Sequence, residues 1–120
     1  MIKRHRISIK NAFNGVKWAL STQANYRIHL FFSIISLIAS WFFKIGYFEF
    51  IIIILLITIG LVIETINTGI EATTDAIDQK FRHDIKLAKD VAAASMLIYA
   101  FGATIIAFII FIPKIINLFF

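Results

Sequence analysis

Three long apolar segments constrain the fold of this chain more than any other feature. They cover about residues 28–43, 50–70 and 91–113. As helices they can cross the roughly 30 Å hydrocarbon layer of a bilayer, the first only barely. The 120 residues are 60% hydrophobic and 16% charged, whereas a soluble domain is about half apolar and a quarter charged. The sequence therefore predicts an all-α integral membrane protein.

The positively charged residues gather beside two ends of these segments. Six precede the first segment and four separate the second from the third: Lys3, Arg4, Arg6, Lys10, Lys17, Arg27, Lys80, Arg82, Lys86 and Lys89. Because cytoplasmic loops are enriched in lysine and arginine, both stretches are expected inside, and the C-terminus outside. The net charge of +5 favours anionic lipid headgroups, and no nucleic acid partner is expected because the charges lie beside apolar segments.

An amphipathic pattern precedes the first apolar segment. Ile9, Phe13, Val16 and Leu20 recur at three- and four-residue steps, which is typical of a helix lying on a membrane surface. We therefore expect a single domain of residues 1–120. It has a surface helix at about 5–22 and transmembrane helices at about 28–45, 48–72 and 91–113, the second extending into the cytoplasm.

An acidic and amide stripe runs along the second transmembrane helix. Its members are spaced by three and four residues, so they share one face of a continuous helix: Glu64, Asn67, Glu71, Asp75 and Asp78. A charge within the apolar layer is costly unless it is paired, hydrated or bound to a metal. Glu64 alone is equally compatible with a protonated carboxyl bonded to a neighbouring helix. The clustering of five favours a functional site.

The chemistry of this stripe suits a magnesium-bound nucleotide. Mg²⁺ commonly takes one or two protein carboxylates and completes its octahedron with water and phosphate oxygens. Lys89 and Asp90 precede the third span, where Lys89 could neutralise a phosphate and Asp90 could hold it or a ribose. A snorkelling lysine beside a solvated aspartate explains these two residues equally well.

The stripe and its surroundings resemble a known family. The run Glu64-Thr65-Ile66-Asn67-Thr68-Gly69-Ile70-Glu71, followed by Asp75 and by Ala88-Lys89-Asp90, is similar to the pattern of the prokaryotic diacylglycerol kinase and undecaprenol kinase family. The resemblance covers essentially the whole chain. It implies a homotrimer with composite active sites in the plasma membrane of a prokaryote. Each site, facing the cytoplasm, transfers the γ-phosphate of ATP to a lipid hydroxyl with Mg²⁺ as cofactor.

The resemblance also implies roles for individual residues. Glu64 is the expected catalytic base and Glu71 the expected metal ligand. The expected nucleotide-binding residues are Asn67, Lys89 and Asp90, with Arg4, Asn11, Lys80 and Arg82 as outer contacts. The residues expected beside the lipid are Ala24, Asn25 and Arg27, together with Glu64.

One position departs from the family pattern. Gln23 stands where the family has a second metal-binding glutamate, and an amide is a weaker Mg²⁺ ligand than a carboxylate. Either Gln23 assists through its carbonyl, or this member is catalytically impaired. A third interpretation is a proton- or cation-coupled transporter in which Glu64 titrates without any nucleotide. The sequence does not choose between undecaprenol and diacylglycerol as the acceptor.

Overall fold

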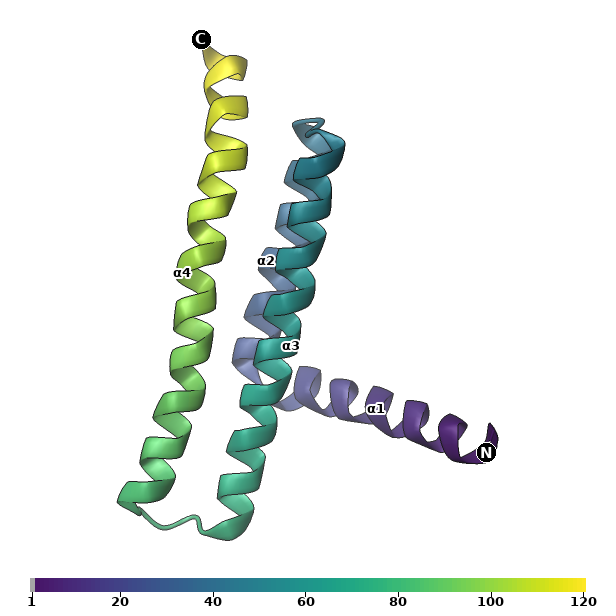
Figure 1. Ribbon diagram of the computed structural model, residues 1–120, viewed down its shortest axis with the longest axis vertical. Coiled ribbons are helices and arrows are strands. Elements are labelled where there is room, and N and C mark those ends of the chain that lie inside the picture. The colour runs from purple at the N-terminus through teal and green to yellow at the C-terminus, as the bar shows by residue number, and fades with distance from the viewer. Residues whose placement is uncertain (1) are drawn as a thin grey trace.

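The computed structural model describes the backbone of residues 2–120 and the side chains of residues 6–120. It consists of four helices, α1 (Ile2–Thr22), α2 (Ala24–Phe42), α3 (Tyr47–Ile77) and α4 (His83–Phe119). The last three run side by side, and α1 leaves the bundle sideways (Figure 1). This confirms the prediction of an all-helical chain.

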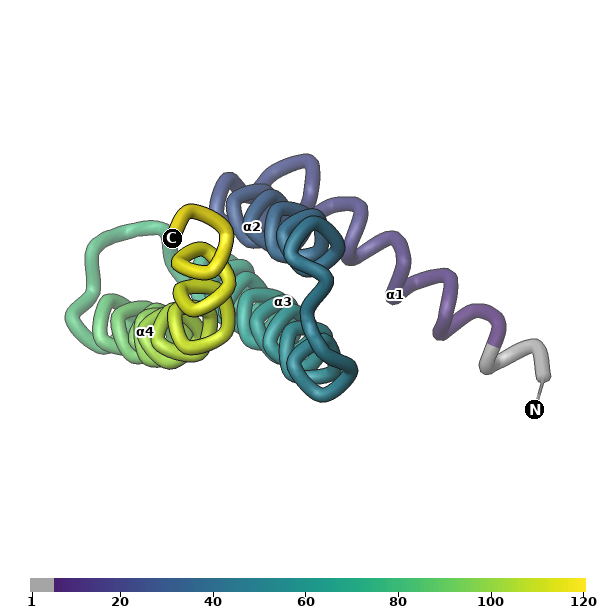
Figure 2. Tube along the Cα trace, turned by 90° about the horizontal axis from the view of Figure 1, so that it is seen from above, coloured from purple at the N-terminus to yellow at the C-terminus, as the bar shows by residue number. Residues whose placement is uncertain are grey.

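The central helix of the bundle is α3. It packs against both α2 and α4, and the view from above shows the three helices in a cluster with α1 pointing away (Figure 2). Side chains also connect α2 to α4, because the rings of His29 and Tyr99 lie 6.4 Å apart. At the other end, the rings of Phe43 and Phe111 lie 6.1 Å apart. Part of α3 is therefore enclosed on two sides.

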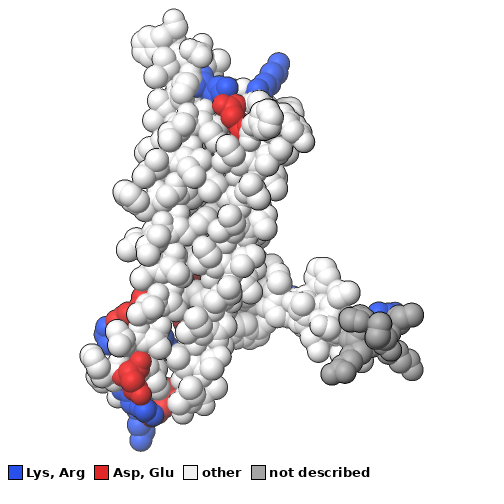
Figure 3. Space-filling model, viewed as in Figure 1, with Lys and Arg blue, Asp and Glu red and all other residues white. Residues whose placement is uncertain are grey.

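The distribution of side chains suits a lipid environment. Within the described residues, α3 and α4 are long and apolar enough to cross a membrane. The helix α2 is shorter, at 19 residues, and its first turns carry Asn25, Arg27 and His29. Charged side chains gather toward the two ends of the bundle, and its middle is free of them on the visible face (Figure 3). An exposed apolar surface in the middle of the bundle is expected where lipid tails surround the protein in place of water.

Arg27 fixes the elbow between α1 and α2. The chain turns at Gln23, which has an extended backbone with φ −101° and ψ 116°. The guanidinium of Arg27 donates hydrogen bonds to the carbonyl oxygens of Leu20 at 3.1 Å and Ser21 at 3.2 Å. The last carbonyls of a helix lack partners within the helix and carry partial negative charge. Arg27 therefore caps α1 and holds it across the bundle.

The turn between α2 and α3 is closed by a carboxylate. Lys44 adopts a positive φ of 49°, and the backbone N–H of Gly46 donates to Glu49 Oε2 at 2.7 Å. Lys114 from α4 approaches the same oxygen at 3.2 Å. Because this turn joins α3 to α4 as well as to α2, one acidic group holds the end of the bundle together.

The polar stripe ends earlier than the sequence predicts. We expected Asp78 to continue the helix, but α3 ends at Ile77 and Asp78 has an extended backbone, with φ −159° and ψ 131°. Its Oδ1 accepts a hydrogen bond from the backbone N–H of Lys80 at 2.8 Å. Aspartate side chains compete for backbone donors in this way and favour turns over helix. Four residues of the stripe, up to Asp75, remain on α3.

Candidate active site

A small cavity lies between α2, α3 and α4, and three residues of the stripe line it. Glu64 and Asn67 are buried, with 2% and 4% of their surfaces exposed, and Glu71 is half-buried. The cavity has a volume of about 170 Å³, and its other lining residues are Asn25, Ile28, His29, Ala93 and Met96. Glu64 and Glu71 therefore face the same space, as one side of a helix requires.

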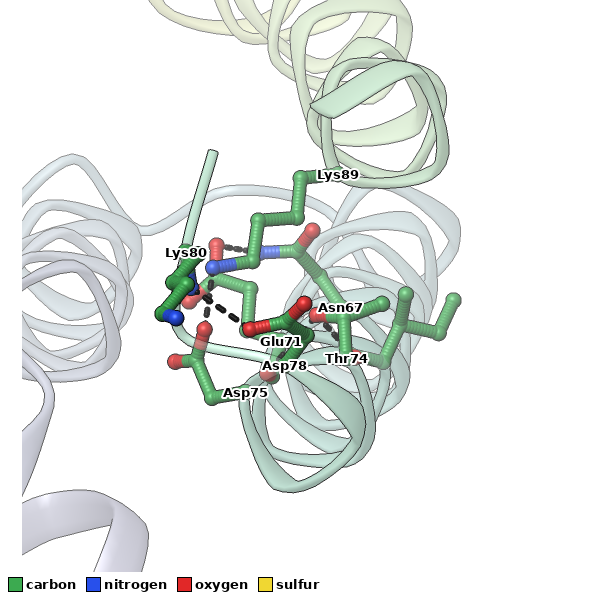
Figure 4. A network of polar contacts seen from close by, with 8 residues as sticks. Asn67, Glu71, Thr74, Asp75, Asp78, Lys80 and Lys89 are labelled. Atoms are coloured by element: carbon green, nitrogen blue, oxygen red, sulfur yellow. Dashed lines mark hydrogen bonds and ion pairs between the residues drawn. The ribbon is translucent and has the colours of Figure 1, made fainter. Parts of the chain in front are cut away.

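Asn67 is the most sharply constrained of these residues. Its amide nitrogen donates to Glu71 Oε1 at 3.2 Å (Figure 4). Its amide oxygen is buried and has no hydrogen-bond partner within the described residues. A buried polar atom without a partner costs about 1–3 kcal/mol. A ligand that brings a hydrogen-bond donor into the cavity would remove that cost.

A larger cavity lies on the other side of Glu71. It has a volume of about 430 Å³ and is lined by Trp18, Gln23, Glu71, Ala72, Asp75, Ala76 and Gln79. Glu71 and Asp75 stand one turn apart on α3, so both carboxylates share this wall. Glu71 therefore lines both cavities, and its carboxylate lies where the small cavity and the wide cavity meet.

The donor set around Glu71 fits a metal that arrives with its own ligands. Within the described residues, no group of three or more histidine, cysteine, aspartate or glutamate side chains could hold a metal ion. The wider cavity offers the carboxylates of Glu71 and Asp75 and the amide of Gln23. Mg²⁺ commonly uses one or two carboxylates together with water and phosphate oxygens. These residues therefore suit a magnesium–nucleotide complex better than a metal enclosed by protein alone.

Lys89 reaches this site from α4, whereas Asp90 is engaged elsewhere. The ammonium of Lys89 forms an ion pair with Asp75 Oδ1 across the gap between the two helices (Figure 4). Asp90 accepts a hydrogen bond from Lys86 Nζ at 2.5 Å on its own helix. The structure thus places the positive charge of Lys89 beside the stripe and leaves Asp90 on the exposed surface of α4.

The loop between α3 and α4 holds its basic residues outside both cavities. Arg82 forms an ion pair with Asp84 at 2.7 Å, and hydrogen bonds from Arg82 hold the pKa of that carboxyl below its usual range. Lys80 is bound through its backbone to Asp78. The role predicted for Arg82 in nucleotide binding would exchange its contact with Asp84 for the nucleotide, whereas the contact of Lys80 leaves its side chain out; both roles stay predictions.

Of the remaining predicted residues within the described part of the chain, only Asn25 lines one of the two cavities. Asn25 lines the small cavity, whereas Arg27 points back to α1. Asn11 and Ala24 are exposed, and Arg4 lies outside the described side chains. Their roles in binding stay predictions.

Three polar or aromatic residues that line the cavities were not predicted as site residues from the sequence: His29, Trp18 and Gln79. His29 lies in the small cavity, and its spacing of four from Asn25 places both on one face of α2. That spacing was the available signal. Trp18 lines the wide cavity, and only the position of α1 against the bundle reveals it.

Comparison with known proteins identifies the family of this chain. A family model described as prokaryotic diacylglycerol kinase matches residues 10–111. An undecaprenol kinase of Bacillus subtilis is 34% identical over 107 residues, which cover 89% of this chain and 87% of the relative. A diacylglycerol kinase of Synechocystis sp. is 28% identical over 113 residues, which cover 93% of this chain but 65% of the longer relative. The family match includes every residue that lines the two cavities, and the chain therefore belongs to the prokaryotic diacylglycerol kinase family of membrane lipid kinases.

Proposed function

We propose that this chain transfers the γ-phosphate of ATP to the hydroxyl of a membrane lipid in a Mg²⁺-dependent reaction. The observation that supports this most directly is the pair of adjoining cavities that share Glu71. The small one contains the buried carboxylate of Glu64, and the wide one offers two carboxylates toward a metal-bound phosphate chain. The names of the two relatives supply the candidate acceptors, diacylglycerol and undecaprenol.

In this proposal Glu64 takes the proton from the lipid hydroxyl. A general base has to lie within hydrogen-bond reach of the proton that it removes, and the small cavity beside Glu64 leaves room for an alcohol. Ile28, Ala93 and Met96 provide the apolar part of the lining, which suits the carbon next to the hydroxyl. The unpartnered oxygen of Asn67 would accept a hydrogen bond from a water molecule that enters with the alcohol.

The wide cavity would hold the phosphates. Glu71, assisted by the Gln23 carbonyl, would bind Mg²⁺, which when bound neutralises the negative charge of the phosphate oxygens. The hydrogen bond from Asn67 would help to hold the Glu71 carboxylate in place when the metal binds. Lys89 would exchange its contact with Asp75 for a phosphate oxygen, since phosphoryl transfer depends mainly on positioning and charge neutralisation.

The membrane arrangement is part of the same proposal. We place α2, α3 and α4 across the plasma membrane, with α1 on the cytoplasmic surface and the C-terminus outside. The basic loop and α1 lie toward the same end of the bundle (Figure 1), which supports one cytoplasmic face. We further propose a homotrimer with composite sites, because exposed apolar residues along α4, such as Leu97, Phe101 and Ile109, offer a surface that other subunits could cover.

The decisive experiment is a phosphoryl-transfer assay on the purified protein in detergent. ATP labelled at the γ-phosphate is incubated with Mg²⁺ and either diacylglycerol, undecaprenol or no lipid. Label should pass into the lipid extract with at least one acceptor and depend on Mg²⁺. Absence of transfer to both lipids, in a preparation that remains folded, would contradict the proposed function.

A further inference from the structure

An aromatic residue of α1 lines the wide cavity and has no role in the mechanism proposed above. Trp18 lines this space together with Gln23 and Gln79, while Glu71 and Asp75 supply its acidic wall. Trp18 is 48% exposed, so about half of the surface of this residue is accessible. The cavity therefore has aromatic, amide and acidic groups around one volume of about 430 Å³, within the usual range for ligand sites.

The backbone that carries Trp18 is held by several side chains. The hydroxyls of Ser21 and Thr22 both donate to the Trp18 carbonyl oxygen at 2.8 Å. Arg27 donates to the carbonyl oxygens of Leu20 and Ser21 in the same last turns of α1, and neighbouring Ala19 is buried with 4% exposed. A residue on a backbone that is already held in place loses less conformational entropy when a ligand binds, which favours binding.

The chemistry of the cavity matches the parts of a nucleotide. Carboxylates suit the metal-bound phosphates, an indole face stacks on a nucleobase, and amides offer both donors and acceptors to a base edge. We propose that Trp18 is the stacking platform for the base of the phosphoryl donor, with Gln79 beside the base edge. This proposal rests on the proposed function, since it names how the donor nucleotide of the same site is recognised.

Intrinsic fluorescence tests the contact without using activity. The chain has two tryptophans, and Trp41 lies at the far end of α2 with 81% exposed. In the Trp41→Phe variant, titration with Mg²⁺-ADP should give a saturable change in the emission of Trp18. Mg²⁺-tripolyphosphate, which has the charge but no base, should give none, and neither ligand should change emission in Trp18→Phe.

Kinetics separate stacking from membrane anchoring, the usual role of tryptophan at a lipid interface. Trp18→Leu keeps an apolar side chain but removes the stacking surface, so the KM for ATP should rise about tenfold with little change in kcat. Trp18→Phe retains a ring and should show a smaller rise. The control is Phe13→Leu on the same helix, at a residue that is 72% exposed, and it should leave the KM for ATP unchanged.

The outcomes distinguish this proposal from the proposed function. Normal transfer with an unchanged KM for ATP in Trp18→Leu, and no nucleotide-dependent emission from Trp18, would overturn the stacking role and leave the kinase function intact. An equal rise in KM for Phe13→Leu would also overturn it, since that result indicates anchoring. A base-dependent change in emission without transfer to any lipid would support stacking and contradict the kinase function.

Discussion

Glu49 and Glu71 are both carboxylates on α3, but they lie toward opposite ends of the bundle and differ in their hydrogen bonds. Glu49 accepts a backbone hydrogen bond at 2.7 Å and pairs with Lys114 at 3.2 Å. Within the described residues, Glu71 receives one side-chain hydrogen bond, from Asn67, and lines two cavities. The comparison indicates that a carboxylate with its partners in place holds the fold, whereas one facing open cavities is available to ligands.

The largest effect at the cavity end of α3 is expected for Glu64→Gln, because Glu64 lines the small cavity together with Glu71. Glutamine keeps the size and polarity of the side chain but cannot accept the hydroxyl proton, so phosphoryl transfer should fall by about 10²- to 10⁴-fold. The assay is labelled-phosphate transfer to the lipid that the unmodified protein uses. Gel filtration and circular dichroism provide the control for folding and assembly. Near-normal activity in a folded variant would remove Glu64 from the role of base.

Glu71→Gln should change the metal requirement rather than the fold. Replacing a carboxylate by an amide weakens a magnesium ligand, so the Mg²⁺ concentration for half-maximal rate should rise roughly tenfold. A magnesium titration of the initial rate measures this directly. The matched control is Glu49→Gln at the other end of the same helix, which should leave the titration unchanged. If the Mg²⁺ concentration for half-maximal rate rose equally in both variants, Glu71 could not be distinguished from Glu49 as a metal ligand.

Gln23→Glu tests the departure from the family pattern. The new carboxylate would face the cavity that Glu71 and Asp75 line, so the Mg²⁺ requirement should fall several-fold and the rate should rise. A large rise in rate indicates that this chain is impaired by its glutamine. An unchanged rate and magnesium titration would mean that the carbonyl of Gln23 already serves, or that this position does not contact the metal.

The sequence was enough to predict that the residues of the stripe share one face of α3, because helical spacing alone determines this. Glu64, Asn67 and Glu71 are three and four residues apart, and one continuous α3 places them on one cavity. The end of the stripe could not be predicted in the same way. Asp78 has the correct spacing, but its side chain binds a backbone donor in the following loop, and that competition is invisible to periodicity.

Contacts between helices were the other part that the sequence did not reveal. A single sequence gives no information on how α1 meets the bundle, so Trp18 could not be assigned to the wide cavity. Arg27 also caps α1, which the sequence did not reveal, because a long flexible side chain can reach carbonyls six and seven residues away; its expected place beside the lipid stays a prediction. Positions on one helix follow from local geometry, whereas contacts between helices depend on the packing of the whole chain.

The smallest expected effect on activity belongs to Gly60→Ala, in the middle of α3 between the two ends. A Cβ atom there would lie 2.6 Å from the Tyr99 hydroxyl oxygen, whose hydrogen bond to the Leu56 carbonyl joins α4 to α3. Displacing this ring should destabilise the fold by about 1–3 kcal/mol, seen as a lower midpoint of thermal unfolding, with transfer at permissive temperature nearly unchanged. Gly102→Ala is the control, because its Cβ would meet nothing within 4 Å and alanine favours helix. A midpoint for Gly60→Ala equal to that of Gly102→Ala would show that the Tyr99 contact does not hold α3 and α4 together.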